Sequence, residues 1–218
     1  HDLDGEADYL DLVASLLGSD EPVVLDELVA VRDLEFVRDD AWPEALALLA
    51  QPPLRSVVTQ EAVASTSALR MRVPSYTAWW LRQHGVVSGR LASSVALLEG
   101  LYDVVVADLD PDFLVTAGAL REVADADPDD LLQRLADPGR EVSRAQVRAL
   151  YARVEPLRPP SEVRAVRHGQ LVVVPADDAV VVDQPDLLPV LGDLAVVPVS
   201  LTDAGRVADI LDLVLASE

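Results

Sequence analysis

The spacing of apolar side chains predicts alternating helices and short strands in the first part of the chain. Residues 9–17 repeat at helical spacing, and Gly18 can end that helix. Residues 22–37 contain two apolar runs that indicate one or two strands. A further helix is expected over residues 40–51, because Asp40 can cap its start and two prolines follow it.

The next segment combines short strands with one compact helix. Residues 57–59 and 69–73 have the length and composition of short strands. Ser75 can cap a helix over residues 76–84, and Gly85 can end it. This helix carries the densest group of aromatic residues in the chain.

The second half begins with helices that have strong start signals. Asp110 and Asp127 each precede a proline and further acids, which suits a helix N-terminus. Ser143 and Gln146 can form a capping box before an apolar stripe. The spacing then becomes that of strands, with a hairpin predicted over residues 163–174 that turns at His168-Gly169. The remaining expected elements are a strand at 179–182, a short helix at 186–191, a strand at 195–199 and a last helix through 207–214, capped by Thr202 or Asp203.

These patterns predict a mixed α+β fold, in which short strands and hairpins alternate with capped helices. The proline-rich connector at Pro156–Pro160 is the best candidate for a boundary. We therefore expect one α+β subdomain at residues 1–155, which contains a positively charged island at 54–98, and a smaller α+β subdomain at 161–218.

Composition excludes several kinds of chemistry. The 218 residues include 38 acids, and all 17 basic residues are arginines, which gives a net charge of −21. Without Lys there is no Schiff base, and without Cys there is no thiolate nucleophile or cysteine-bound zinc. We do not expect so acidic a chain to bind nucleic acid or an anionic membrane. We expect a cytoplasmic protein that uses no cofactor.

The residue types that are rare or absent indicate the kind of genome that encodes the chain, and the apolar runs are short. The absence of Lys and Asn and the single Ile indicate a GC-rich, actinobacterial genome, because these residues use A/T-rich codons. The only methionine is Met71, so we expect the chain to be a piece of a longer protein. No apolar run reaches the roughly 18 residues of a membrane-spanning helix.

Residues that could bind a metal are few and poorly spaced. His84 and His168 have no second ligand at helical spacing, and His1 is terminal. Residues 2–8 resemble a calcium loop, but no Glu stands at the twelfth position of such a loop. Three further acids could bind a hard cation or simply lie in a turn: Asp177, Asp178 and Asp183. We therefore expect no catalytic residue and no metal site.

One segment, residues 54–98, differs from the rest of this acidic chain and is called the Arg/Trp island below. It holds five arginines and one acid, whereas residues 1–40 hold 13 acids and two arginines. Its candidate partner-binding residues are Arg70, Arg72, Tyr76, Trp79, Trp80, Arg82 and His84.

Three interpretations of the island are open. Its helix could bury the aromatic side chains in a core, or it could be a docking surface of the residue types that dominate interfaces. It could also form an internal seam with the acidic first 40 residues. Burial of Trp79 and Trp80 would exclude docking through the faces of their indoles.

Short stretches spread over most of the chain carry a resemblance to a known family. They are Arg38–Pro43 (RDDAWP), Leu54–Thr59 (LRSVVT), Val73–Arg82 (VPSYTAWWLR), Gly100–Asp103 (GLYD), Val142–Tyr151 (VSRAQVRALY) and Ala179–Leu188 (AVVVDQPDLL). They resemble the region beyond the ATPase in large actinobacterial sacsin-like proteins, which are similar to the ninety-kilodalton heat-shock chaperones. The ATP-binding domain of that family needs an Asn for magnesium and phosphate, and this chain has no Asn. The resemblance therefore implies a middle or C-terminal domain without the ATP-binding site.

From this resemblance we expect a non-catalytic domain of a chaperone-type ATPase whose partners are proteins. Those partners would be its own ATPase domain, client proteins or a second copy. Two alternatives stay open: a stand-alone hydrolase that uses converging carboxylates and a metal, or a structural spacer. A concave pocket holding two or more acids would favour the hydrolase.

Overall fold

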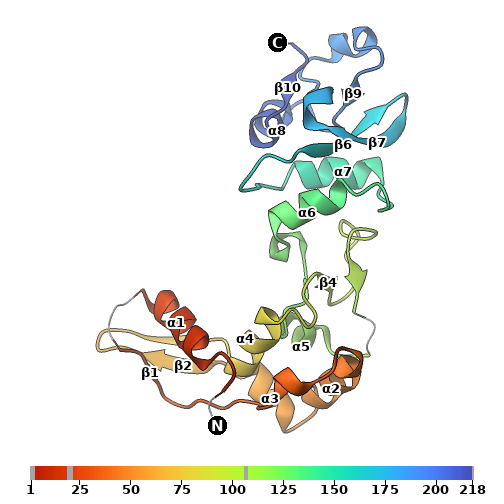
Figure 1. The fold of residues 1–218 in the computed structure, drawn as a ribbon. Coiled ribbons are helices and arrows are strands. Elements are labelled where there is room, and N and C mark those ends of the chain that lie inside the picture. Colours follow the sequence, from red (N-terminus) through yellow and green to blue (C-terminus); the bar gives the residue numbers. More distant parts are fainter. Residues whose placement is uncertain (1–2, 19–21, 106–107, 218) are drawn as a thin grey trace. The chain divides into compact units, whose positions relative to one another are not determined.

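The computed structural model describes residues 3–18, 22–105 and 108–217. Helices and small sheets form a mixed α+β fold, as the sequence predicts (Figure 1). The chain divides into two compact units. Unit 1 comprises His1–Ser93 and Val104–Arg121, and unit 2 comprises Ser94–Asp103 and Glu122–Glu218.

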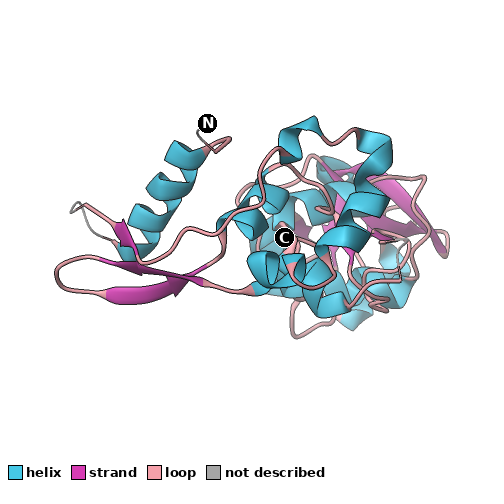
Figure 2. Cartoon of the chain, turned by 90° about the horizontal axis from the view of Figure 1, so that it is seen from below, coloured by secondary structure: helices cyan, strands magenta, loops and turns pink. Residues whose placement is uncertain are grey.

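Unit 1 contains a small antiparallel sheet of order β1-β2-β3, with α1 packed beside it (Figure 2). Among its described residues, four shorter α-helices and strand β4 build most of the rest of the unit. The elements are α1 (Glu6–Leu17), β1 (Val24–Leu25), α2 (Trp42–Leu49), α3 (Leu54–Thr59), β2 (Ala62–Ser65), β3 (Arg70–Val73), α4 (Tyr76–Gln83), β4 (Arg90–Leu91) and α5 (Pro111–Thr116).

The register of β2 and β3 sorts their side chains onto two faces of the sheet. Ala64 pairs with Met71, and Val63 pairs with Arg72. Because side chains alternate along a strand, these two pairs lie on opposite faces. The face with Ala64 is buried, whereas Arg70 and Arg72 are exposed on the other. Helix α1 adds three buried residues to the core of unit 1: Tyr9, Val13 and Leu17.

Unit 2 is organised around a five-stranded sheet of order β10-β8-β9-β6-β7. Strand β8 is parallel to β9 and β10, while β6 is antiparallel to β7 and β9. The elements are α6 (Pro128–Leu135), α7 (Arg144–Tyr151), β6 (Glu162–Arg167), β7 (Gln170–Pro175), β8 (Ala179–Val181), β9 (Ala195–Val196), α8 (Ala204–Leu211) and β10 (Val214–Leu215). Strand β5 (Asp103–Val104) includes the point where the chain passes from unit 2 to unit 1.

The caps predicted at Ser75, Asp110, Asp127 and Ser143 and the predicted hairpin are confirmed. Asp40 does not cap α2, which follows Ala41, and Asp203 precedes α8 without a side-chain cap. The Ser75 hydroxyl accepts a hydrogen bond from the Ala78 N–H at 3.0 Å, and the Asp127 carboxylate accepts one from the Asp130 N–H at 2.8 Å. Ser143 and Gln146 form the expected reciprocal capping box. Strands β6 and β7 pair around the His168-Gly169 turn, in which both residues have positive φ.

Three further local predictions are wrong. Residues 57–59 belong to helix α3 instead of a strand, and residues 34–36 form a 3-10 turn. The last helix ends at Leu211, and Val214 lies in β10. The branched side chains of α3 favour a strand locally, but α3 packs against α4 and α5 and buries Val58, so tertiary contacts override the local preference.

The expected boundary at residues 156–160 is not where the two compact units divide. The segments before and after it are joined inside unit 2 by Arg164 of β6. Its guanidinium donates to the carbonyl oxygens of Leu135 at 2.7 Å and Arg140 at 3.0 Å, and also to that of Asp137. Its backbone N–H donates to the Tyr151 hydroxyl at 2.8 Å. The connector is therefore an internal loop of unit 2.

The helices are short. Among the described residues the longest is α1, with 12 residues, and isolated helices of this length are marginal in water. Their stability therefore comes mainly from packing. No helix within the described ranges has both the length and the apolar character that crossing a membrane requires.

Candidate interaction site in unit 1

Helix α4 is the buried centre of the Arg/Trp island. The Ser75 hydroxyl caps its start and also donates to the Val58 carbonyl at 2.7 Å, which ties α4 to α3. Six successive residues, 76 to 81, are buried. A helix buried on all sides belongs to a core. Gly85, at φ 66°, then turns the chain out of the helix.

The aromatic residues of the island are core residues. Trp79 is 7% exposed, while Trp80 and Tyr76 are each 2% exposed. Tyr9 of α1 contacts both Tyr76 and Trp79, with ring centroids 5.5 and 5.4 Å apart. Trp42 contacts Trp80 at 6.0 Å. The prediction of a docking surface is wrong for Tyr76, Trp79 and Trp80, because other parts of unit 1 cover the faces of their rings.

The acidic N-terminal segment packs directly on this cluster. The Trp80 indole Nε1 donates to the Asp4 carboxylate at 2.9 Å, and the Tyr76 hydroxyl donates to the Asp4 backbone carbonyl. His84 stacks on the Trp80 ring at 3.8 Å, and its Nε2 lies 3.6 Å from the same carboxylate. The internal seam is thus the interpretation that the contacts of α4 support.

This environment changes the acidity of Tyr76. Burial, and then the negative charges of Asp4, Glu35 and Glu6, raise the pKa of Tyr76 to about 12. A neutral hydroxyl is what the contact needs, since it donates its proton to the Asp4 carbonyl.

Arg82 also has a structural role. Its guanidinium donates to the carbonyl oxygens of Thr116 at 2.9 Å and Val115 at 3.3 Å, at the C-terminal end of α5. A cation there adds a donor to carbonyls at the end of the helix and suits the helix dipole. Gly118 makes this approach possible, since a Cβ at that position would lie 2.9 Å from Arg82 Cγ.

Arg70 and Arg72 are the members of the predicted site with the most exposed ion pairs. Their side chains are 70% and 79% exposed, on the open face of β3. Arg70 pairs with Asp26, and Arg72 lies 3.7 Å from Glu61. Ion pairs this exposed contribute roughly 0–1 kcal/mol each, so both arginines can exchange their partners.

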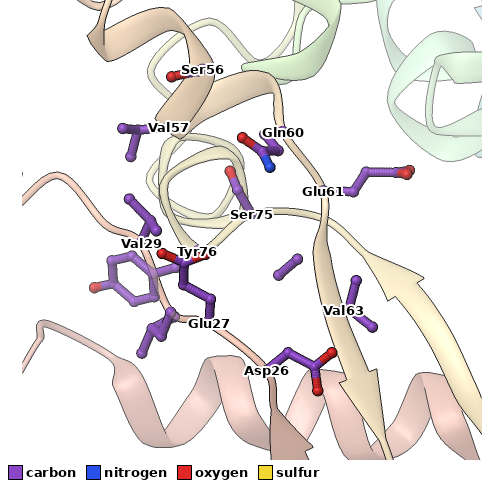
Figure 3. Close-up of a pocket in the computed structure, with 12 residues that line it drawn as sticks. Asp26, Glu27, Val29, Ser56, Val57, Gln60, Glu61, Val63, Ser75 and Tyr76 are labelled. Atoms are coloured by element: carbon purple, nitrogen blue, oxygen red, sulfur yellow. The ribbon is translucent and has the colours of Figure 1, made fainter.

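The same region contains a cavity of about 360 Å³ that the sequence did not reveal. We call it the acidic cavity. Three segments line it: residues 26–29, residues 56–63 and the start of α4 at 75–76 (Figure 3). Its acidic lining residues are Asp26, Glu27 and Glu61, and its apolar ones include Leu28, Val29, Val57 and Val63. In Figure 3, Val29, Val57 and Tyr76 lie on one side, and Asp26, Glu61 and Val63 on the other.

Two apolar side chains of the acidic cavity are open to solvent. Leu28 is 36% exposed and Val29 is 47% exposed. The run Asp26-Glu27-Leu28-Val29 places acids beside apolar residues in the sequence, but this local pattern does not by itself indicate a cavity. Helix α3 contributes Ser56 and Val57 to the lining, and the strand-like spacing of residues 57–59 does not indicate this helix.

The other candidates from the sequence do not form a metal centre. His168 lies in the hairpin turn, with Nε2 3.5 Å from Asp193. His1 and Asp2 lie outside the described residues, and Asp4 is used by the seam. Asp178 and Asp177 lie in a 3-10 turn, and Asp183 accepts from Ser217 at 2.5 Å. Within residues 3–18, 22–105 and 108–217, no three His, Asp or Glu residues are grouped so that they could hold a metal ion.

Comparison with known proteins gave no match. No protein-family model fits the chain, and no curated protein or solved structure is significantly similar to it. The resemblance to sacsin-like proteins therefore enters only as part of the proposal that follows.

Proposed function

We propose that this chain is a non-catalytic domain of a sacsin-like, chaperone-type ATPase, and that its acidic cavity binds protein partners. The partner segment would carry an apolar side chain next to Arg or Lys. The observation that supports this most is the combination of exposed apolar residues and carboxylates in one cavity of unit 1.

The chemistry of the lining selects that kind of segment. Leu28 and Val29 are already partly exposed, so an apolar side chain that covers them removes apolar surface from water. Glu27 has no ion-pair partner within the described part of the chain, and can pair with a cation beside the apolar group. Asp26 and Glu61 can exchange their exposed arginines for a cation of the partner.

The expected binding is weak and reversible. Burying one large apolar side chain contributes about 1.5–3 kcal/mol, and each exposed ion pair adds up to about 1 kcal/mol. Ordering the partner segment offsets part of this gain. Micromolar or weaker affinity suits a contact with client proteins, or with an ATPase domain that moves during its cycle.

Peptide binding tests the proposal. Two labelled peptides with the same apolar core, one flanked by arginines and one by glutamates, are titrated with the protein and followed by fluorescence anisotropy. We expect saturable binding of the arginine peptide, at least about tenfold tighter than that of the glutamate peptide, and weaker in high salt.

Matched variants locate the binding site. Val29→Asn should weaken binding, whereas Val24→Asn should not, because Val24 is 59% exposed but does not line the cavity. The pair Glu27→Gln and Glu61→Gln should remove the preference for arginine, and Glu44→Gln on α2 is the control. Equal binding of both peptides, or equal effects of test and control variants, would reject the cavity as the site.

The stand-alone hydrolase is the second candidate, because three carboxylates line the acidic cavity. Two of them already face arginines, which favours the binding function. Ester and phosphoester hydrolysis measured with Mg²⁺ or Zn²⁺ separates the two. Turnover that Asp26→Asn and Glu61→Gln abolish would support the hydrolase, and tight nucleotide binding by this chain would oppose a domain without the ATP site.

A further inference from the structure

Unit 2 contains a larger cavity of about 600 Å³ with a different character. Helix α7, the β6–β7 turn and residues 182–201 line it. Figure 1 shows α7 beside β6 and β7. The apolar lining residues include Val166, Val182, Val196 and Val197. This volume lies within the usual range for sites that bind small molecules.

The charges around this cavity are unusual for so acidic a protein. Although the chain has 38 acids, none of the described residues that line the cavity is Asp or Glu. Arg144 and Arg148 line it instead, four residues apart on α7, where side chains lie on the same face. Two acids contact lining residues: Asp193 lies 3.5 Å from His168, and the Asp203 carboxylate accepts a hydrogen bond from the Ser200 hydroxyl.

Both arginines are exposed and available. In the part of the chain that the structure describes, neither guanidinium has an ion pair or a side-chain hydrogen bond. Two arginines of the preceding segment differ, since Arg134 pairs with Asp130 at 2.8 Å and Arg140 with Asp137 at 3.7 Å. Cations without partners beside an apolar cavity suit an anion that carries an apolar group.

The mouth of the cavity offers apolar surface as well. Leu194 is 46% exposed and Leu201 is 52% exposed, and both line the cavity. A ligand that covers them would gain from the removal of apolar surface from water, while its charged head remains at the arginines.

We propose that this cavity binds an amphipathic carboxylate, with its apolar chain among the valines and its head group held by Arg144 and Arg148. The carboxylate could belong to a free fatty acid or to the C-terminus of an apolar peptide. Both present the same chemistry: one carboxylate on an apolar chain. This inference concerns unit 2 alone and does not depend on the function proposed for unit 1.

Decanoate below its micelle-forming concentration is the first probe, and amide NMR shifts in the whole chain are the readout. We expect saturable shifts at Gly169 and Gly192, which line the cavity. Decanol, which lacks the charge, should bind at least about tenfold more weakly, and decylamine more weakly still. An apolar tripeptide with a free C-terminus, compared with its amide, distinguishes the two sources: tighter binding of the free tripeptide than of decanoate would assign a protein C-terminus.

The variant pair Arg144→Gln and Arg148→Gln should weaken decanoate binding at least about tenfold and remove the preference over decanol. Arg158→Gln, at another exposed arginine of unit 2 outside the cavity, should leave both unchanged. Leu194→Trp, at an exposed position, should block the mouth and weaken both ligands. The proposal is overturned if neither decanoate nor the free tripeptide gives saturable shifts. It is also overturned if decanol binds as tightly as decanoate, or if the Arg144/Arg148 variant binds like the unaltered chain.

Discussion

The indole Nε1 of Trp80 donates a hydrogen bond of 2.9 Å to the carboxylate of Asp4, across 76 residues of sequence. This contact joins the acidic N-terminal segment to the helix that carries the island's aromatic residues. The same carboxylate oxygen lies 3.6 Å from His84 Nε2. The Asp4 carboxylate therefore serves Trp80 on α4 and His84, the residue that directly follows this helix.

Asp4→Ala should destabilise unit 1 by roughly 1–3 kcal/mol, because it leaves the buried indole N–H without an acceptor. The measurement is urea unfolding followed by tryptophan fluorescence, and all three tryptophans lie in unit 1. The control is Asp11→Ala, at an exposed position within α1, which should be neutral or slightly stabilising. Equal midpoints for the two variants would show that the Asp4 contact contributes nothing.

The tyrosines should resist ionisation in the folded protein. The chain has four, and burial raises the pKa of each: Tyr9, Tyr76, Tyr102 and Tyr151. For Tyr102, the hydrogen bond to Asp130 adds to the effect of burial.

A raised pKa means that the folded state holds the phenol proton more tightly than the unfolded state does. The stabilisation from Tyr76 is therefore fully present below the unfolded value of 10, and is lost as pH rises through about 12. We expect little tyrosinate absorbance near pH 10, and a cooperative rise at higher pH that coincides with unfolding. A tyrosine that titrates reversibly near pH 10 while the protein stays folded would contradict this.

Gly100→Ala and Gly205→Ala should change the stability of unit 2 in opposite directions. Gly100 has φ 78°, and a Cβ there would overlap the backbone carbonyl of Glu141. The expected cost is about 2–5 kcal/mol, from backbone strain and steric overlap. Gly205 lies in α8 with open space around it, so alanine should stabilise the helix by about 0.5–1 kcal/mol. Thermal unfolding followed by circular dichroism measures the stability of both variants. A change of stability in the same direction for both would refute these roles of the two glycines.

Arg164 should be essential to unit 2 although it has no carboxylate partner among the described residues. It is 6% exposed, and its guanidinium donates to three backbone carbonyls at and beyond the C-terminal end of α6. Burial lowers its pKa, and the negative end of the helix dipole favours the charge.

Arg164→Met should cost roughly 2–4 kcal/mol, because it removes the side-chain donor to the carbonyls of Leu135 and Arg140 and leaves the Asp137 carbonyl with the Arg140 N–H alone. Arg164→Lys should rescue little of this loss, since a lysine cannot reproduce the planar donors of arginine. Exposed Arg158→Met is the matched control. Chemical denaturation measures all three variants, and full stability in Arg164→Lys would show that charge alone is sufficient.

Predictions that depend on neighbours within one helical turn or one hairpin were the most accurate. The caps at Ser75, Asp127 and Ser143 follow from a side chain and an N–H three residues away. The hairpin follows from the positive φ that His168 and Gly169 adopt. By contrast, the burial of Trp79 and the helical state of residues 57–59 depend on segments that are distant in sequence.

For the candidate sites, too, local sequence indicates some features and contacts between distant segments decide others. The sequence identified the Arg/Trp island from its composition, but gave its aromatic residues three possible roles. The choice between core and surface depends on whether Tyr9 and Trp42 cover the indoles. Both cavities combine residues from three or more segments, so no local pattern could indicate them.

The sequence by itself determined the mixed α+β class, the starts of the main helices and the hairpin of unit 2, because hydrogen bonds and apolar spacing act over a few residues. Only the tertiary structure decided that the acidic N-terminal segment closes on α4, that Arg82 and Arg164 serve as helix caps, and that the units divide elsewhere than at the prolines. The physical reason is that burial depends on which distant segments meet. A tryptophan, an arginine or a carboxylate has the same local signal whether it lies in a core or on a surface.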